Sequence, residues 1–238
     1  MTAPVWVISV VRDWEMYKRC VADNPFLQGC ARVPYDNSRE NLPVSVRYNR
    51  FLQEGAAEGW IVFCHEDWEV LEPLAEAVSR LDPEKIYGVI GVSLEEGRWR
   101  DLLVIKGAVQ QCGKDGGDPK EIRGRDASGR VDTVDCQCLI VHSSLVARLG
   151  LRFDERLAFD MYAEDFCVAA FEQADVVTEV FPLACRHHSG GHTSRGFRPA
   201  LRLVRAKYRT AKKRYASIVG HHSTFGGRGC KPVRKWRR

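Results

Sequence analysis

A short apolar run that ends in three polar residues constrains the fold of this chain more than any other segment. Residues 60–64 are apolar, rich in β-branched and aromatic side chains, and followed at once by His65, Glu66 and Asp67. Their number, their composition and the preceding Gly59 predict a buried strand rather than a helix. Ligands of open α/β sheets bind beyond the carboxyl ends of the strands, where carboxylates can hold a hard cation. The run therefore predicts a site at a strand end, unless Asp67 only caps a helix and its two neighbours are solvated.

Strand and helix patterns alternate along most of the chain. Short apolar runs predict strands at residues 5–11, 29–33, 60–64, 86–92, 102–105, 131–141 and 176–181. Helical spacing and capping signals predict helices at residues 13–21, 44–58, 73–81, 143–149 and 162–174. This alternation is typical of βαβ units, so it predicts an α/β fold with a mainly parallel sheet flanked by helices. The Gly-rich, charged segment 113–129 is predicted to be a mobile surface loop.

The length and composition are those of a globular protein. The 238 residues allow one large domain, or one domain with a tail. No stretch approaches the roughly 18 uninterrupted apolar residues of a membrane span, and the amino terminus lacks the basic start of a signal peptide. The nine cysteines follow no disulfide-framework or zinc-site spacing, so we expect a reducing, cytoplasmic location.

Charge is divided unevenly along the chain. Residues 1–179 hold 20 basic and 31 acidic residues, whereas residues 180–238 hold 16 Lys and Arg and no acidic residue. Between residues 199 and 219, apolar residues recur every three or four positions among basic ones, which predicts a basic amphipathic helix. The last residues of the chain are predicted to be disordered.

A basic tail on an acidic body predicts a polyanionic partner. An anionic membrane surface or a lipid-linked, diphosphate-bearing acceptor fits this tail best. A nucleic acid fits less well, because the tail has no zinc-ligand spacing, no RNP signature and no regular aromatic residues. The remaining alternative is a solvated helix that only aids solubility.

Three clusters of polar residues could meet in one site. They are the segment 65–67, the acidic residues between 154 and 165, and the His-rich turn at 187–192. On these clusters the chain resembles the family 2 type of nucleotide-sugar glycosyltransferases with a GT-A fold, and in particular their bacterial glycosyltransferase-like branch. In that branch a short His/acid motif after an apolar strand replaces the usual Asp-x-Asp, as residues 65–67 do here.

The resemblance covers about residues 4–195. A further block of that branch, glrFDE…fYaeDf, is matched by residues 150–155 and 162–167, and a His-rich turn follows at residues 187–191. One departure lies at Val134-Asp135-Cys136, where relatives more often have Val-Asp-Gly. The bulkier residue at this position bears on the fit of the donor or acceptor sugar.

The resemblance implies a metal-dependent, inverting glycosyltransferase with two parts, a catalytic GT-A domain at residues 1–195 and a basic, partly disordered helical tail at residues 196–238. Such an enzyme transfers a sugar from a nucleotide-diphosphate donor to a hydroxyl of a glycan or lipid-linked acceptor, as in the making of cell-surface polysaccharide. We expect it in the cytoplasm, with peripheral contact to the inner face of the membrane. Two other hypotheses remain: a non-catalytic protein that binds polyanions or nucleic acid through its tail, and a catalytically inactive relative that serves as a scaffold.

A divalent cation, Mn²⁺ or Mg²⁺, would neutralise the charge that develops on the nucleoside diphosphate as it leaves. Asp67 is the first candidate for a direct ligand and His65 is a further one, and a histidine ligand would favour Mn²⁺. The His-rich turn of the family implies that His188 completes the metal shell or contacts the diphosphate, ahead of His187 and His192. A Gly-flanked turn of this kind could also close over the nucleotide.

The Glu-Asp motif of the family implies that Asp165 is the general base for the acceptor hydroxyl, with Glu164 as the second candidate. A single base opposite the leaving group implies inversion at the anomeric carbon. Without the resemblance, Asp160 and Glu164 would form an ordinary exposed helix face. The residues that correspond to the family's contacts with the base, ribose and diphosphate of the donor are Val11, Asp36, Asn49, Arg50 and Glu66.

Overall fold

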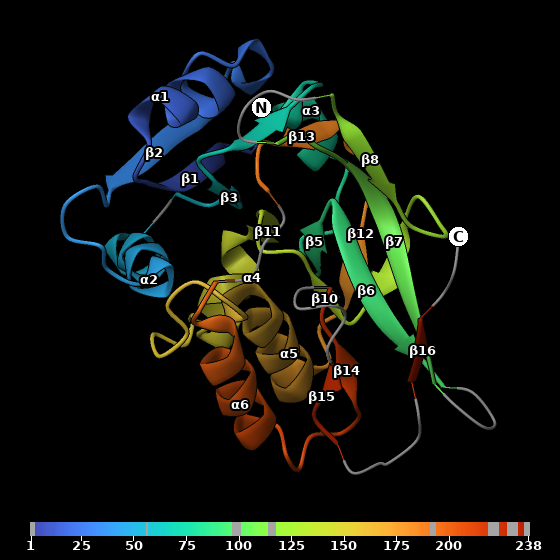
Figure 1. Cartoon of the computed structure of the whole chain (residues 1–238). Coiled ribbons are helices and arrows are strands. Elements are labelled where there is room, and N and C mark those ends of the chain that lie inside the picture. Colours follow the sequence, from blue (N-terminus) through green and yellow to red (C-terminus); the bar gives the residue numbers. More distant parts are fainter. Residues whose placement is uncertain are drawn as a thin grey trace.

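Two β-sheets with helices packed on them form the body of the protein (Figure 1). The computed structural model describes residues 3–55, 57–96, 101–113, 118–190, 194–218, 224–227 and 233–235. The chain begins in the first sheet, makes most of the second sheet in its middle part, and then returns to the helices α5 and α6 (Figure 1).

The first sheet has seven strands in the order β2-β1-β3-β11-β5-β12-β9. Its strands are β1 (Val5–Val11), β2 (Ala31–Asp36), β3 (Trp60–His65), β5 (Ile86–Gly88), β9 (Gly129–Val131), β11 (Cys138–His142) and β12 (Thr178–Val180). Strands β2, β1 and β3 are parallel, as are β5 and β12, whereas β11 runs antiparallel to both of its neighbours. The sheet is more mixed than the mainly parallel arrangement that the sequence predicts, because the chain enters β11 from the second sheet without a crossover helix.

The second sheet has the order β10-β6-β7-β13-β4, and β8 and β16 also pair with β7. Its strands are β4 (Trp68–Val70), β6 (Ile90–Glu95), β7 (Asp101–Gln111), β8 (Lys120–Arg123), β10 (Thr133–Val134), β13 (Cys185–His187) and β16 (Val233–Lys235). The loop predicted at residues 113–129 is wrong in part, because β8 is an antiparallel partner of β7. Residues 114–117 of that loop lie outside the described residues.

Helices cover both faces of the first sheet. They are α1 (Trp14–Tyr17), the π-helical η1 (Lys18–Ala22), the 3₁₀ turn η2 (Pro25–Leu27), α2 (Val44–Glu54), α3 (Leu74–Val78), α4 (Ser143–Leu149), α5 (Tyr162–Ala174) and α6 (Phe197–Lys207). Because side chains alternate along a strand, Ile8 and Phe63 face a cluster with α2, α4, α5 and α6, while Val7 and Val62 face one with η1 and α3. The predicted bounds of α4 and α5 are confirmed, and the predicted cap Asp13 accepts a hydrogen bond from the Met16 N–H at 3.0 Å.

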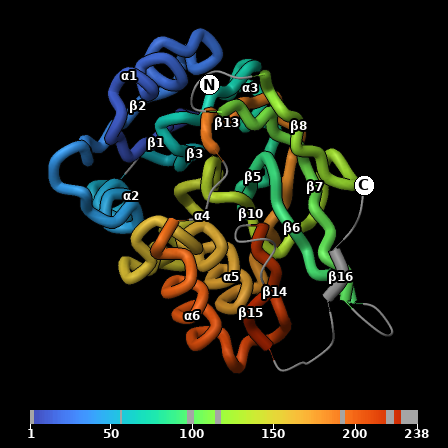
Figure 2. The backbone as a smooth tube through the Cα atoms, viewed as in Figure 1, coloured from blue at the N-terminus to red at the C-terminus, as the bar shows by residue number. Residues whose placement is uncertain are grey.

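The carboxyl-terminal segment, residues 196–238, packs against the body of the protein through its described part. Phe197 and Leu201 of α6 are buried in the same cluster as α5, and α6 lies alongside α5 (Figure 2). The helix predicted over residues 199–219 is too long, because α6 ends at Lys207 and the short strands β14 (Tyr215–Ala216) and β15 (Thr224–Phe225) follow. The division of the chain at residue 195 stays a prediction, and of the predicted disordered end only residues 224–227 and 233–235 are described.

Ion pairs attach this segment to the acidic body. Lys207, Lys212, Lys213 and Arg214 pair with Asp165, Asp175, Asp132 and Asp101 at distances of 2.5–2.9 Å. Part of the positive charge that the sequence assigns to a polyanionic partner, including these four of the 16 basic residues, is therefore neutralised by the protein itself. Within the described residues, five arginines from position 195 onward have no ion pair, namely Arg195, Arg198, Arg202, Arg205 and Arg209.

Candidate functional site

Three side chains from the two sheets meet at the carboxyl end of β3. His65 ends β3, Asp67 lies in the turn between β3 and β4, and His187 ends β13, which pairs with β4. One ligand atom of each residue lies within 4.8 Å of those of the other two. Asp67 Oδ1 is 3.3 Å from His187 Nε2 and 3.9 Å from His65 Nδ1. Two imidazoles and a carboxylate at this spacing form a candidate site for a divalent cation.

Tyr162, the first residue of α5, orients the ring of His65. Its hydroxyl donates to the Cys136 carbonyl at 2.9 Å, so its oxygen accepts the Nε2–H of His65 at 3.0 Å. This pairing leaves Nδ1 of the neutral ring unprotonated and facing Asp67, as a metal ligand must be. Burial lowers the pKa of His65 more than the Asp67 carboxylate raises it, which keeps the ring neutral. Sequence reasoning missed Tyr162, because an aromatic residue at the start of an apolar helix has the pattern of a core residue.

The substitution Tyr162→Phe is expected to weaken Mn²⁺ binding by about 10- to 100-fold, the usual effect of losing a group that orients a histidine ligand. Titration of free Mn²⁺ followed by electron paramagnetic resonance measures this loss. Tyr87→Phe is the matched control, because the Tyr87 hydroxyl bonds to the Asp82 N–H and to none of the three residues. Equal Mn²⁺ affinities in the two variants would rule out the orienting role of Tyr162.

His187 and Asp67 form the most strongly coupled pair of the group. Burial alone would lower the pKa of His187, but the Asp67 carboxylate outweighs it and raises that pKa. Burial alone would raise the pKa of Asp67, but His187 and His65 outweigh it and hold that pKa below its ordinary value. Nε2 of His187 is buried and has no hydrogen-bond partner of good geometry within the described residues. A cation held by the three side chains would supply the missing partner, so the residues present fit a divalent ion.

His188 lies next to this group but not in it. Its Nε2 is 2.8 Å from Glu69 Oε2, and its backbone N–H donates to the Asp67 carbonyl. The structure thus brings His187, which the sequence ranks lower, to His65 and Asp67. The missed signal is strand alternation, since Cys185 and His187 share the buried face of β13. His192 lies outside the described residues.

Three residues predicted to contact the donor lie together at the carboxyl ends of parallel strands. Val11 ends β1 and stands in register with Asp36, which ends β2. Glu66 Oε2 accepts the backbone N–H groups of Arg12 and Asp13 at 2.5 and 2.9 Å. These bonds tie the end of β1 to the turn that carries the candidate metal ligands.

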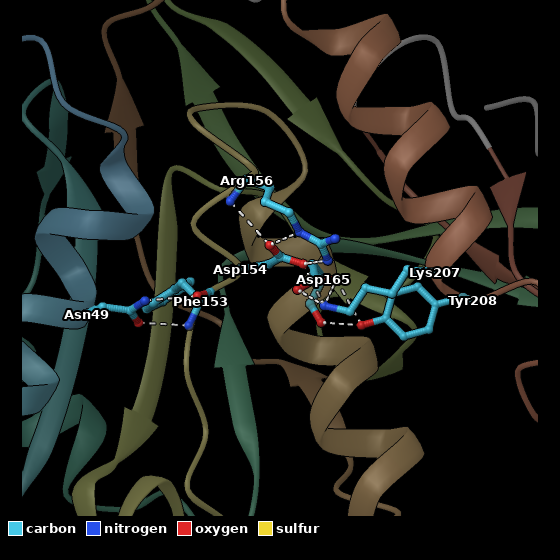
Figure 3. A network of polar contacts seen from close by, with 7 residues as sticks. All are labelled: Asn49, Phe153, Asp154, Arg156, Asp165, Lys207 and Tyr208. Atoms are coloured by element: carbon cyan, nitrogen blue, oxygen red, sulfur yellow. Dashed lines mark hydrogen bonds and ion pairs between the residues drawn. The ribbon is translucent and has the colours of Figure 1, made fainter.

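The other two predicted donor residues lie on α2 and have different surroundings. Arg50 lines a surface hollow of about 350 Å³ together with Pro34, Tyr35, Asp36, Arg39, Glu40 and Arg47. Asn49 is buried instead, and its amide exchanges two 2.9 Å hydrogen bonds with the backbone of Phe153 (Figure 3). The structure therefore uses Asn49 to join α2 to the segment before α5.

Asp165, the predicted general base, is buried beneath α6 (Figure 3). Lys207 Nζ is 2.8 Å from its Oδ1, and the Tyr208 hydroxyl donates to the same oxygen at 2.9 Å. Burial raises the pKa of Asp165, although Lys207 and Tyr208 act in the opposite direction. Lys207 also pairs with Asp154 at 3.1 Å, and Arg156 and Lys207 hold the pKa of Asp154 well below its usual range. The Asp165 carboxylate thus helps to hold α6 on α5.

Glu164, the second candidate base, is covered by the residues that follow β14. Its Oε1 accepts the Ser217 hydroxyl at 2.6 Å, and within the described residues its buried Oε2 has no hydrogen-bond partner. Burial raises the pKa of Glu164 to about 7, against the smaller, lowering effect of Ser217. The carboxyl-terminal segment therefore encloses both acids of the predicted Glu-Asp motif.

The raised pKa of Glu164 predicts a pH-dependent free energy of unfolding. Between pH 4.5 and 7 the folded protein holds a proton on Glu164 that the unfolded chain has lost, so stability falls as pH rises through this window and levels off above it. The shift corresponds to about 3 kcal/mol. Urea unfolding of the natural protein and of Glu164→Gln at pH 4.5 and 8 measures it, because other groups cancel in the difference. A difference in stability that is the same at both pH values would contradict the burial of a protonated Glu164.

The fold of this protein is similar to those of solved glycosyltransferase structures. No sequence-family profile and no curated protein matches the chain. Among solved structures, GalNAc-T7 with UDP, GalNAc and Mn²⁺ superposes with a TM-score of 0.51 at 11% identity, over 82% of this chain and 45% of GalNAc-T7. Residues 1–349 of S. aureus TarS in complex with UDP give a TM-score of 0.52 at 12% identity, over 88% of this chain and 67% of TarS.

The fold is that of the GT-A glycosyltransferases. The predicted GT-A architecture is therefore confirmed, whereas membership of family 2 stays a prediction. At sequence identities of 11–12%, these similarities show the fold alone. The chain spans less than half the length of GalNAc-T7. The GT-A fold brings residues 65–67 to the carboxyl end of β3, next to β1 and β2.

Proposed function

We propose that this protein is a metal-dependent glycosyltransferase that moves a sugar from a nucleoside-diphosphate donor to a hydroxyl acceptor with inversion. The observation that carries the proposal is the group of His65, Asp67 and His187 at the carboxyl end of β3. Ligands of open α/β sheets bind at this end of the strands. GalNAc-T7 and TarS, which share the fold, were solved with UDP, and GalNAc-T7 also with Mn²⁺.

The three side chains suit Mn²⁺ better than Mg²⁺, because two of them offer imidazole nitrogen and Mg²⁺ prefers oxygen ligands. A bound divalent ion would neutralise charge on the diphosphate leaving group. The chain's own contribution is to hold Asp67 as a carboxylate and His65 in the tautomer that leaves Nδ1 free. His188 remains a candidate for diphosphate contact from its place beside Asp67.

The donor nucleotide is proposed to lie across the ends of β1 and β2. Val11, Asp36 and Glu66 meet there, and the hollow lined by Asp36 and Arg50 opens at the edge of the same strands. A guanidinium can form paired hydrogen bonds with phosphate, which suits Arg50 to this place once it leaves Glu54, now 2.8 Å away. Asn49 is proposed to support the site indirectly, because its hydrogen bonds to the Phe153 backbone hold α2 in place.

Asp165 is proposed as the general base, with Glu164 as the alternative. Both lie in the first turn of α5, directly after the segment that reaches His65. The Lys207 contact must open for Asp165 to meet an acceptor hydroxyl, because this contact occupies the carboxylate in the structure. A catalytic role for Asp165 therefore requires the Lys207 contact to open, whereas a purely structural role requires it to stay closed.

Calorimetric titration of UDP, GDP and CDP, each with Mn²⁺ and then with EDTA, tests the proposal. Metal-dependent binding of one nucleotide establishes a donor site and identifies its base. Absence of binding to all three, with or without metal, would sink the proposal and favour a polyanion-binding protein that acts through its tail.

The acceptor is proposed to be a glycan or a lipid-linked precursor, and the place of action the cytoplasm with peripheral contact to an anionic membrane. The observation that favours this contact is the exposure of Arg198, Arg202 and Arg205 on α6 and of Arg209 just after it. Each arginine near an anionic surface contributes about 1 kcal/mol of attraction. No helix within the described residues is both long and apolar enough to cross a bilayer. Sedimentation with phosphatidylglycerol vesicles, against pure phosphatidylcholine vesicles, tests the contact.

A further inference from the structure

Phe159 presents an apolar ring to solvent beside the candidate metal group. Its side chain is 46% exposed, more than any other large apolar side chain within the described residues. The ring stacks on that of His65, with centroids 5.5 Å apart and planes inclined by 23°. Phe159 is thus an exposed apolar ring within stacking distance of a candidate metal ligand, and covering such a ring removes apolar area from water.

The backbone on both sides of Phe159 is anchored. On one side, the Ala158 carbonyl accepts the Val44 N–H at 2.7 Å. On the other side, the buried Asp160 carboxylate accepts the Ser194 hydroxyl. Met161 then adopts a left-handed conformation with φ of 66°, which non-glycine residues rarely adopt, and its side chain is fully buried. The ring is therefore held in its exposed position by fixed neighbours.

We propose that Phe159 packs against the pyranose ring of the donor sugar. This inference rests on the proposed function, and it adds a residue that recognises the sugar itself. A sugar bound to a diphosphate at His65 and Asp67 has to lie within a few ångströms of those residues, where Phe159 is the exposed apolar surface. The C–H groups of a pyranose face are apolar, so an aromatic ring removes them from water and fixes the plane of the sugar.

The donor ring fits this position better than the acceptor ring. It is covalently tied to the diphosphate that the same residues would hold, whereas the acceptor approaches from the opposite side of the anomeric carbon. Asp135 is a candidate partner for a sugar hydroxyl, because it is half-buried and near enough to His65 and His187 for its charge to oppose the lowering effect of burial on the pKa of each.

Calorimetry of UDP, UDP-glucose and UDP-N-acetylglucosamine with Mn²⁺ tests the inference on the full chain and its variants. Phe159→Ala is expected to weaken binding of a UDP-sugar by about 10-fold and binding of UDP by less than about twofold. Phe159→Trp, which keeps an aromatic face, is expected to retain the affinity for the sugar. Phe26→Ala is the matched control, because Phe26 is 37% exposed and lies in η2, and within the described residues its ring contacts no ring of the site.

The possible outcomes separate the two proposals. Metal-dependent binding of UDP by the natural protein, with a loss confined to the UDP-sugars in Phe159→Ala, supports both. Equal losses for UDP and UDP-sugars would show that the ring only positions His65, and unchanged affinities for all three ligands would place the ring outside the donor site. Either of these results overturns the inference and leaves the proposed function intact. Failure of the natural protein to bind any nucleotide overturns the proposed function, and the inference with it.

Discussion

Replacing Asp67 by alanine is expected to abolish Mn²⁺-dependent nucleotide binding, with a loss of more than about 100-fold, because even the groups that only orient metal ligands contribute 10- to 100-fold. Asp67 is the one carboxylate of the three-residue group, and it lies within 3.9 Å of both imidazoles. Its removal takes away the negative charge that offsets the cation and leaves His187 without the neighbour that raises its pKa. Calorimetry of the nucleotide with and without Mn²⁺ measures the loss.

The control for this experiment is Glu69→Gln. Glu69 lies on β4, two residues beyond Asp67, and its carboxylate pairs with His188 instead of the three-residue group. We expect this variant to bind Mn²⁺ as the natural protein does, and any weaker nucleotide binding in it would report on His188. If Asp67→Ala retains both the nucleotide affinity and the Mn²⁺ requirement, Asp67 is not a metal ligand.

Replacing Asp165 by asparagine is expected to lower the release of nucleoside diphosphate from the donor by about 10²- to 10⁴-fold, the usual contribution of a general base. Nucleotide affinity should stay the same, because the side-chain contacts of Asp165 are with Lys207 and Tyr208 and not with the three-residue group. Steady-state assays of nucleotide release, together with calorimetry, measure the two effects on one preparation.

Lys207→Met is the matched variant for this test. It breaks the same buried ion pair but keeps the carboxylate, so it separates catalysis from folding. Breaking such a pair costs about 3–5 kcal/mol, so both variants should be assayed well below their unfolding temperatures. Retained activity in Lys207→Met with loss in Asp165→Asn identifies the base, whereas equal losses in the two variants would falsify the catalytic role of Asp165.

The elements that sequence reasoning placed correctly are those with a local signal. The strand at 5–11 and the helices at 143–149 and 162–174 have the predicted bounds, because a continuous apolar run, helical apolar spacing and Gly150 act within a few residues. The extent of α6 was predicted wrongly, because the same apolar spacing continues beyond its last helical residue, where Lys213 and Arg214 bind buried acids of the body instead. A local pattern does not contain these distant partners.

In the candidate site, too, the positions of residues with a local sequence signal were predicted correctly and the positions set by distant contacts were not. His65 and Asp67 follow from one strand end, and the structure places them together. The choice between His187 and His188 depends on the register of β13 against β4, which join residues more than 100 positions apart. The sequence also could not show that Asn49 forms hydrogen bonds with the Phe153 backbone, or that Asp165 pairs with Lys207. Those contacts arise only when distant elements pack.

The carboxyl-terminal segment supplies partners for buried acids of the rest of the chain. Four buried carboxylates, those of Asp101, Asp132, Glu164 and Asp165, receive an ion pair or a hydrogen bond from residues between 207 and 217. A shortened protein that ended at residue 195 would keep the polar residues of the candidate site, but it would lose the partners of these acids together with the apolar side chains of α6 that pack on α5. We therefore expect residues 196–238 to be needed for the stability of residues 1–195, so a cut at the point where the charge changes sign would not yield two independently stable parts.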